Sequence, residues 1–116
     1  MKKDNAASKE IGLRIAQRRK QLGLTQEQLA EQAEVSAQFI ACVERGQNNM
    51  RAENIVKLSA AMQVSTDYIL TGKLNEVDRS FFMELLEPLT VKELHCLEEI
   101  VKNYLIAYGH DVPKQN

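Results

Sequence analysis

The chain has 116 residues, enough for one compact domain with a small appended element but not for two large cores. Hydrophobic residues make up 44% and charged residues 27%, and the chain has only 5 Gly and 2 Pro, which disfavours an all-β or loop-rich fold. The net charge of -1, taken alone, argues against a nucleic-acid partner. No apolar run approaches the roughly 20 residues of a membrane span, and no secretory signal is visible. We therefore expect a cytoplasmic, mostly helical protein that makes no membrane contact.

The charge is unevenly distributed along the chain. Residues 1–71 hold ten Lys and Arg against eight Asp and Glu, a net charge of +2, whereas residues 72–116 hold five against eight, a net charge of -3. The densest positive cluster is formed by Arg14, Arg18, Arg19 and Lys20. A local basic patch matters more for nucleic-acid binding than the total charge, so a DNA partner remains compatible with this composition.

The first predicted elements are a flexible tail and two helices. Residues 1–8 are polar and lack apolar periodicity, Ser8 is a candidate N-cap, and Gly23 ends a first helix over residues 9–22. Thr25 followed by Gln28 has the spacing of a capping box, which predicts a short second helix over residues 26–33.

Ser36 is a candidate N-cap for a third helix over residues 36–45, which Gly46 ends. Only the three residues 34–36 separate it from the second helix, and two short helices joined by so tight a turn form a helix-turn-helix arrangement. Apolar spacing predicts a fourth helix over residues 52–62, and Ser65 or Thr66 caps a fifth. These five helices would make one domain over residues 9–72.

Residues 73–116 form a second block, predicted to be a helical hairpin. An amphipathic helix that includes Val77 and Phe82 ends before Pro88, and the pair Thr90 and Glu93 has the spacing of a capping box that starts a long helix over residues 91–108. This long helix carries a broad apolar stripe, which favours a dimer interface over a hairpin that only covers its own domain. The predicted interface residues are Leu94, Leu97, Val101, Tyr104, Leu105 and Tyr108.

About half of the chain resembles the phage-repressor/Cro-like helix-turn-helix family, often called the XRE family. The matching stretches are R-x-x-Q-L-G-L-T-Q-E-Q-L-A-E-Q-A at 18–33, V-S-x-x-x-I-x-x-x-E-R-G-Q-N-N at 35–49, E-N-I-V-K-L-S-A-A-M-Q-V-S at 53–65 and D-Y-I-L at 67–70. The resemblance implies an all-α fold, with a five-helix lambda-repressor-like DNA-binding domain followed by the C-terminal helical hairpin.

The resemblance also implies which residues meet DNA. In helix-turn-helix domains the second helix of the motif lies in the major groove, so the helix at 36–45 would read bases. The expected base-reading residues are Ser36, Ala37, Gln38, Phe39, Ala41 and Cys42. Gln38 has the side chain for a bidentate contact with adenine, and the small residues suit thymine methyl groups, whereas Phe39 fits either core packing or a base contact.

Phosphate contacts and one structural pair complete the implied site. The expected phosphate-contacting residues are Arg18, Gln26, Gln47, Asn48, Asn49 and Arg51, at the ends of helices or in the loop after the third helix. The family pattern places Arg19 and Glu44 as a salt bridge between the first and third helices rather than at the DNA.

The function that follows is a sequence-specific DNA-binding transcriptional regulator, expected to be a repressor that binds a palindromic operator in double-stranded DNA as a homodimer. The alternative is an antitoxin or partner-controlled regulator whose C-terminal helices bind another protein. We expect no enzyme activity, since His95 and His110 have no nucleophile motif nearby. We also expect no cofactor and no metal, because Cys42 and Cys96 lack companion ligands at metal-binding spacing.

Overall fold

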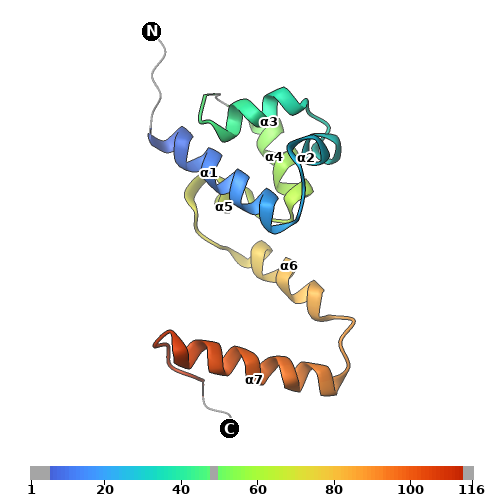
Figure 1. Ribbon diagram of the computed structural model, residues 1–116, viewed down its shortest axis with the longest axis vertical. Coiled ribbons are helices and arrows are strands. Elements are labelled where there is room, and N and C mark those ends of the chain that lie inside the picture. The colour runs from blue at the N-terminus through green and yellow to red at the C-terminus, as the bar shows by residue number, and fades with distance from the viewer. Residues whose placement is uncertain (1–5, 48–49, 114–116) are drawn as a thin grey trace. The chain divides into compact units, whose positions relative to one another are not determined.

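The computed structural model describes residues 6–47 and 50–113 (Figure 1). Seven helices and no strand occur in these residues, which confirms the predicted all-α fold. The chain divides into two compact units, one over residues 1–81 and the other over residues 82–116. No helix in the described ranges has the length and apolar character needed to cross a membrane.

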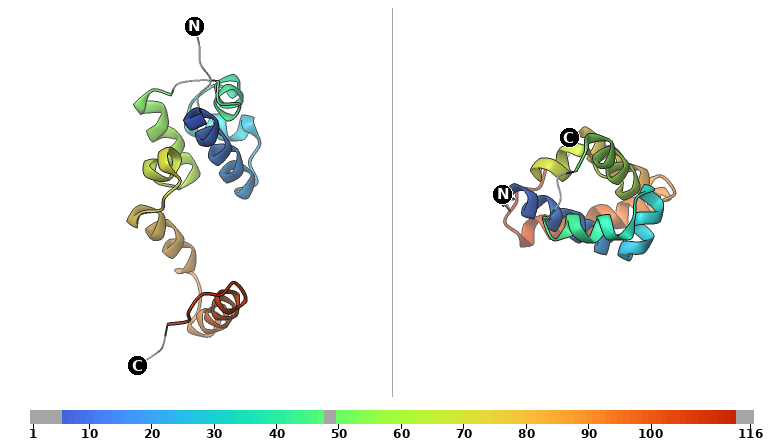
Figure 2. Two further views of the ribbon diagram at one scale, coloured as in Figure 1. Left: turned by 90° about the vertical axis from the view of Figure 1, so that its left-hand side faces the viewer. Right: turned by 90° about the horizontal axis from the view of Figure 1, so that it is seen from above.

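Five helices build the first unit. They are α1 (Ala6–Gln21), α2 (Gln26–Ala33), α3 (Ala37–Glu44), α4 (Ala52–Met62) and α5 (Thr66–Thr71), and they gather around a common centre (Figures 1 and 2). The bounds of α2 and α4 are those predicted from caps and apolar spacing. Helix α3 is flanked by Ser36 as N-cap and Arg45 as C-cap, so the predicted range of 36–45 includes its two cap residues.

The core of this unit is apolar and receives side chains from all five helices. Its buried members are Ile15, Leu29, Ala30, Ala33, Ile40, Val43, Leu58, Met62, Val64 and Ile69. Helices α1 and α3 lie side by side (Figures 1 and 2), and Gly12 permits their close approach, because a Cβ atom there would lie 2.3 Å from the carbonyl oxygen of Val43. The closeness of α1 and α3 fixes the orientation of α3 on the rest of the domain.

Two arginines of α1 bind the carbonyl ends of other helices. Arg14 Nε donates to the carbonyl oxygen of Ile69 at 3.0 Å, and Arg18 Nε donates to that of Met62 at 3.0 Å. The last carbonyl groups of a helix lack intrahelical partners and carry partial negative charge, so guanidinium groups satisfy them well. These contacts tie α1 to the ends of α5 and α4.

The predicted start of α1 is wrong. The helix begins at Ala6 and Ser8 lies inside it, so the predicted tail of residues 1–8 is helical in its last three residues, and residues 1–5 lie outside the described ranges. Alanine has the highest helix propensity, and Ala6 and Ala7 allow the helix to extend past a residue that would suit an N-cap.

The predicted second block, residues 73–116, holds α6 (Glu76–Leu86) and α7 (Val91–Ala107). Helix α6 begins in the first compact unit and ends in the second. The capping box predicted at the start of α7 is confirmed: Thr90 Oγ1 accepts from the Glu93 N–H at 3.2 Å, and Glu93 Oε1 accepts from the Thr90 N–H at 2.9 Å. Helix α7 has no buried residue, although it carries the apolar stripe. Its apolar side chains therefore stay accessible in the single chain.

Candidate nucleic-acid interface

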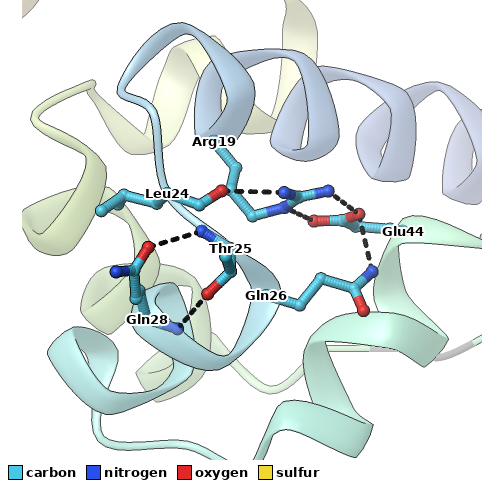
Figure 3. A network of polar contacts seen from close by, with 6 residues as sticks. All are labelled: Arg19, Leu24, Thr25, Gln26, Gln28 and Glu44. Carbon is cyan, nitrogen blue, oxygen red and sulfur yellow. Dashed lines mark hydrogen bonds and ion pairs between the residues drawn. The ribbon is translucent and has the colours of Figure 1, made fainter.

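The turn between α2 and α3 is built from three local capping arrangements. At the start of α2, Thr25 Oγ1 accepts from the Gln28 N–H at 3.0 Å and Gln28 Oε1 accepts from the Thr25 N–H at 2.8 Å, which confirms the predicted capping box (Figure 3). Glu34 ends α2 in the left-handed region with φ of 59°. Ser36 then caps α3, since its Oγ accepts from the Phe39 N–H at 3.0 Å. The sequence itself thus specifies this turn.

A buried polar network holds α3 against α1 and α2 (Figure 3). Arg19 Nε lies 2.6 Å from Glu44 Oε2, and its Nη2 donates to Glu44 Oε1 at 3.0 Å, so the two side chains form a bidentate salt bridge. Arg19 Nη1 also donates to the carbonyl oxygen of Leu24 at 2.9 Å, and Gln26 Nε2 donates to Glu44 Oε1 at 3.0 Å. The Arg19 and Glu44 side chains are only 11% and 8% exposed.

The electrostatics of this network favour the charged forms. Burial raises the pKa of Glu44, but hydrogen bonds from Arg19 and Gln26 outweigh that effect and leave the pKa below its ordinary value. The hydrogen bond to Glu44 likewise raises the pKa of Arg19. Both groups stay ionised at neutral pH, and their salt bridge ties α3 to α1.

The exposed face of α3 carries few polar atoms. Ser36 and Gln38 are exposed, whereas Ala41 and Cys42 are half-buried. Gln38 therefore presents both a hydrogen-bond donor and an acceptor from the first turn of the helix. Ala41 and Cys42 follow it on α3, and we call these two side chains the small-residue strip.

Two of the predicted base-reading residues face partly inward. Ala37 and Phe39 are half-buried and pack against the core cluster. For Phe39 this geometry favours the core-packing alternative that the sequence left open. The accessible surface of α3 is thus smaller than a surface made of all six predicted base-reading residues.

The predicted phosphate-contacting residues lie in different environments. Gln47 and Arg51 are exposed, and Arg51 is the N-cap of α4 without a side-chain capping bond. The side chains of Arg18 and Gln26 are partly occupied, by the carbonyl of Met62 and by Glu44 respectively. Asn48 and Asn49 lie outside the described residues.

Sequence reasoning missed Arg45, the C-cap of α3. This arginine is exposed, its Nε donates to Gln47 Oε1 at 3.0 Å, and its Nη2 lies 3.5 Å from Cys42 Sγ. Its guanidinium therefore lies beside the small-residue strip of α3. The signal in the sequence was a lone cation at the last position of the predicted helix at 36–45.

Within residues 6–47 and 50–113, no three His, Cys, Asp or Glu side chains are grouped so that they could hold a metal ion. Cys42 and Cys96 are free thiols.

Comparison with known proteins relates this geometry to a recognised group. The helix-turn-helix family profile matches residues 15–69. Repressor protein C2 of Salmonella phage P22 is 37% identical over 71 residues, which is 61% of this chain and 33% of that protein. This chain thus matches about a third of the phage repressor's length. An uncharacterized HTH-type transcriptional regulator of Sinorhizobium fredii, y4wC, is 32% identical over 101 residues, which is 84% of this chain and 71% of the relative.

A solved structure gives the same relationship in three dimensions. The P22 c2 repressor, crystallised in complex with the synthetic operator 9T, is 40% identical and covers 54% of this chain and 96% of its own chain, with a TM-score of 0.53. The helix-turn-helix profile match over residues 15–69 includes α3.

Proposed function

Because the chain belongs to the helix-turn-helix family of transcriptional regulators, we propose that it represses transcription by binding a palindromic operator in double-stranded DNA as a homodimer. The observation that carries this proposal is α3, which presents an exposed Gln38 beside small side chains while the Arg19–Glu44 salt bridge holds the helix in place. The relatives are a phage repressor and an HTH-type transcriptional regulator, which supports the prediction that the chain is not an enzyme.

Base recognition centres on Gln38. Its carboxamide suits a bidentate contact with adenine N6 and N7, worth roughly 1–3 kcal/mol of discrimination. Ala41 and Cys42 suit apolar contacts with thymine methyl groups, and Ser36 lies at the exposed start of the motif. Ala37 contributes mainly by being small enough to let the helix approach the base edges.

Phosphate contacts would position the domain without reading sequence. Gln26 stands at the N-terminus of α2, where backbone N–H groups and the helix dipole favour an anion. Gln47, Arg51 and Arg45 are exposed in or beside the segment after α3 and supply further donors. Arg18 retains this role only through N–H groups that its bonds to Met62 and Gln21 leave available.

Dimerisation through the second unit is supported by its unburied apolar surface. A groove of about 480 Å³ is lined by Phe82, Leu86, Leu94, Leu97, Glu98, Val101, Lys102, Leu105 and Pro113. Next to it along α7, the rings of Tyr104 and Tyr108 stack with centroids 4.6 Å apart, and both side chains are exposed. Soluble monomers rarely leave so large an apolar patch uncovered, and a second copy of α7 would cover it with matching apolar side chains.

The decisive experiment selects bound sites from random DNA and repeats the selection with Gln38→Ala. We expect the wild-type chain to select an inverted repeat, and the variant to lose preference at one base pair of each half-site while its melting temperature stays the same. Gln17→Ala, which truncates an exposed glutamine on α1, is the matched control and should select the wild-type sequence. Unchanged base preference in Gln38→Ala would remove Gln38 from the reading surface, and selection of no sequence by the wild type would contradict the proposed function.

A further inference from the structure

The only buried side chain of α6, a helix that the structure describes completely, is a carboxylate. Asp78 lies in the first turn and is 8% exposed, while the other side chains of α6 are half-buried or exposed. Burying a charged group is costly unless hydrogen bonds compensate it. A helix whose only buried side chain is a carboxylate, and not an apolar group, is attached by directional polar contacts.

Those contacts join the beginnings of α5 and α6 within the first unit. Asp78 Oδ1 accepts from the Ser65 N–H at 2.7 Å, and Oδ2 accepts from the Ser65 hydroxyl at 2.7 Å and from the Asn75 N–H at 2.8 Å. Ser65 Oγ also accepts from the Tyr68 N–H at 2.9 Å and so caps α5. Asn75 Nδ2 donates to Asp67 Oδ2 at 2.8 Å. We call Ser65, Asp67, Asn75 and Asp78 the Asp78 clamp.

The clamp constrains orientation as well as position. Hydrogen bonds depend strongly on angle, whereas apolar contacts are largely non-directional. Asn75 Oδ1 also accepts from the Val77 N–H at 2.9 Å and so caps the first turn of α6. Since α6 continues as one helix from Glu76 to Leu86, the clamp holds the turn at which this helix begins in the first unit.

We propose that Asp78 is a positioning residue that sets which spacing between two DNA half-sites the protein accepts. This inference rests on the proposed dimer, whose interface follows the clamp in the chain and is formed by the last turns of α6 and by α7. When one DNA-binding domain of the dimer has bound its half-site, the other domain reaches the second half-site at an effective concentration that depends on the stiffness of the segment between the domains. If the first turn of α6 is fixed, the second DNA-binding domain is held at the distance that suits one spacing between half-sites. If the turn is loosened, the domain reaches half-sites at several spacings.

The test compares Asp78→Asn with Glu76→Gln, which removes the same charge from an exposed position of the same turn. Affinity is measured for one half-site and for inverted repeats whose spacer changes by one base pair at a time. We expect Asp78→Asn to keep single half-site affinity within about twofold, to lose about tenfold in affinity at the preferred spacing, and to bind neighbouring spacings more evenly. Glu76→Gln should behave as the wild type, and light scattering should show the same dimer for all three chains.

A second variant covers the case in which Asp78→Asn fails to fold. Asn75→Ala removes the bond to Asp67 and the side-chain acceptor for Val77 but leaves the buried carboxylate in place, and it should broaden the spacing preference in the same direction. The proposed role of the clamp would be overturned, and the proposed dimer left standing, by either of two results. Both folded variants could keep the wild-type spacing preference, or they could lose affinity equally for one half-site and for two half-sites. A wild-type chain that is monomeric and gains nothing from a second half-site would overturn the proposed dimer and, with it, the clamp's role.

Discussion

The salt bridge between Arg19 and Glu44 is the residue-scale contact on which the position of α3 depends. Glu44→Ala would leave the Arg19 guanidinium nearly buried without its carboxylate, and breaking such a pair costs roughly 3–5 kcal/mol. We expect urea denaturation to show a loss of this size, together with weaker DNA binding. Glu31→Ala, at an exposed position of α2, is the control and should stay within about 0.5 kcal/mol of the wild type. Equal midpoints for the two variants would contradict the structural role.

Two residues adopt a backbone conformation that disfavours their side chains. Glu34 and Gln63 end α2 and α4 with φ of 59° and 54°, a region that costs an ordinary L-residue about 1–2 kcal/mol and that glycine enters freely. Both side chains are exposed, so truncation removes little packing. We expect Glu34→Gly and Gln63→Gly each to raise the free energy of unfolding by several tenths to about 1 kcal/mol, because the gain in the left-handed turn is partly offset by the greater freedom of glycine in the unfolded chain. Thermal melting checks this, and lower melting temperatures in both variants would show that their side chains stabilise the turns.

At the scale of helices, local signals were sufficient where a cap residue begins the element. Thr25, Ser36, Ser65 and Thr90 each accept a backbone N–H within three residues, so the starts of α2, α3, α5 and α7 could be predicted from neighbouring sequence alone. The start of α1 could not, because helix propensity at Ala6 outweighs the cap signal at Ser8.

Contacts between distant segments explain what the sequence missed at the candidate site. Arg18 carries the charge expected of a phosphate ligand, yet it binds the carbonyl of a residue 44 positions away. The partners of Asp78 include a residue 13 positions earlier in the chain, and no local pattern connects the two. Phe39 has the position of a base reader, but its packing against the core depends on the tertiary arrangement. Such pairings follow from the packing of helices, which single-sequence periodicity does not specify.

The apolar face of α7 predicts which substitutions weaken the proposed dimer. Val101 lines the groove of the second unit and is 44% exposed, so Val101→Asp would place a charge in the proposed dimer interface. Asn103→Asp adds the same charge two positions later, which at about 3.6 residues per turn lies on the opposite face of the helix. We expect Val101→Asp to raise the dimer dissociation constant at least about tenfold, or ~1.4 kcal/mol, and Asn103→Asp to leave it nearly unchanged. Sedimentation equilibrium measures both, and equal constants would place the interface elsewhere.

For the whole molecule, two hydrogen-bonded carboxylates predict how stability responds to acid. Burial raises the pKa values of Glu44 and Asp78, but hydrogen bonds from Arg19 and Gln26 in the first case, and from Asn75 and Ser65 in the second, leave both pKa values below the ordinary range. In the unfolded chain a Glu and an Asp have pKa values of about 4.3 and 3.9. At a pH between these values and the lower pKa values of the folded state, the unfolded chain binds more protons than the folded protein.

Stability from these two groups is therefore complete above about pH 5 and is lost as the pH falls through 4 and below. We expect the urea midpoint of the wild type to be flat from pH 7 to 5 and to fall steeply below pH 4. The double variant Glu44→Gln/Asp78→Asn should start from a lower stability and show a shallower slope, because it has lost the groups whose protonation drives the transition. A matched double variant at the exposed positions Glu31 and Glu76 should retain the wild-type slope. If it loses the slope equally, acid unfolding reflects the general charge of the chain rather than these two sites.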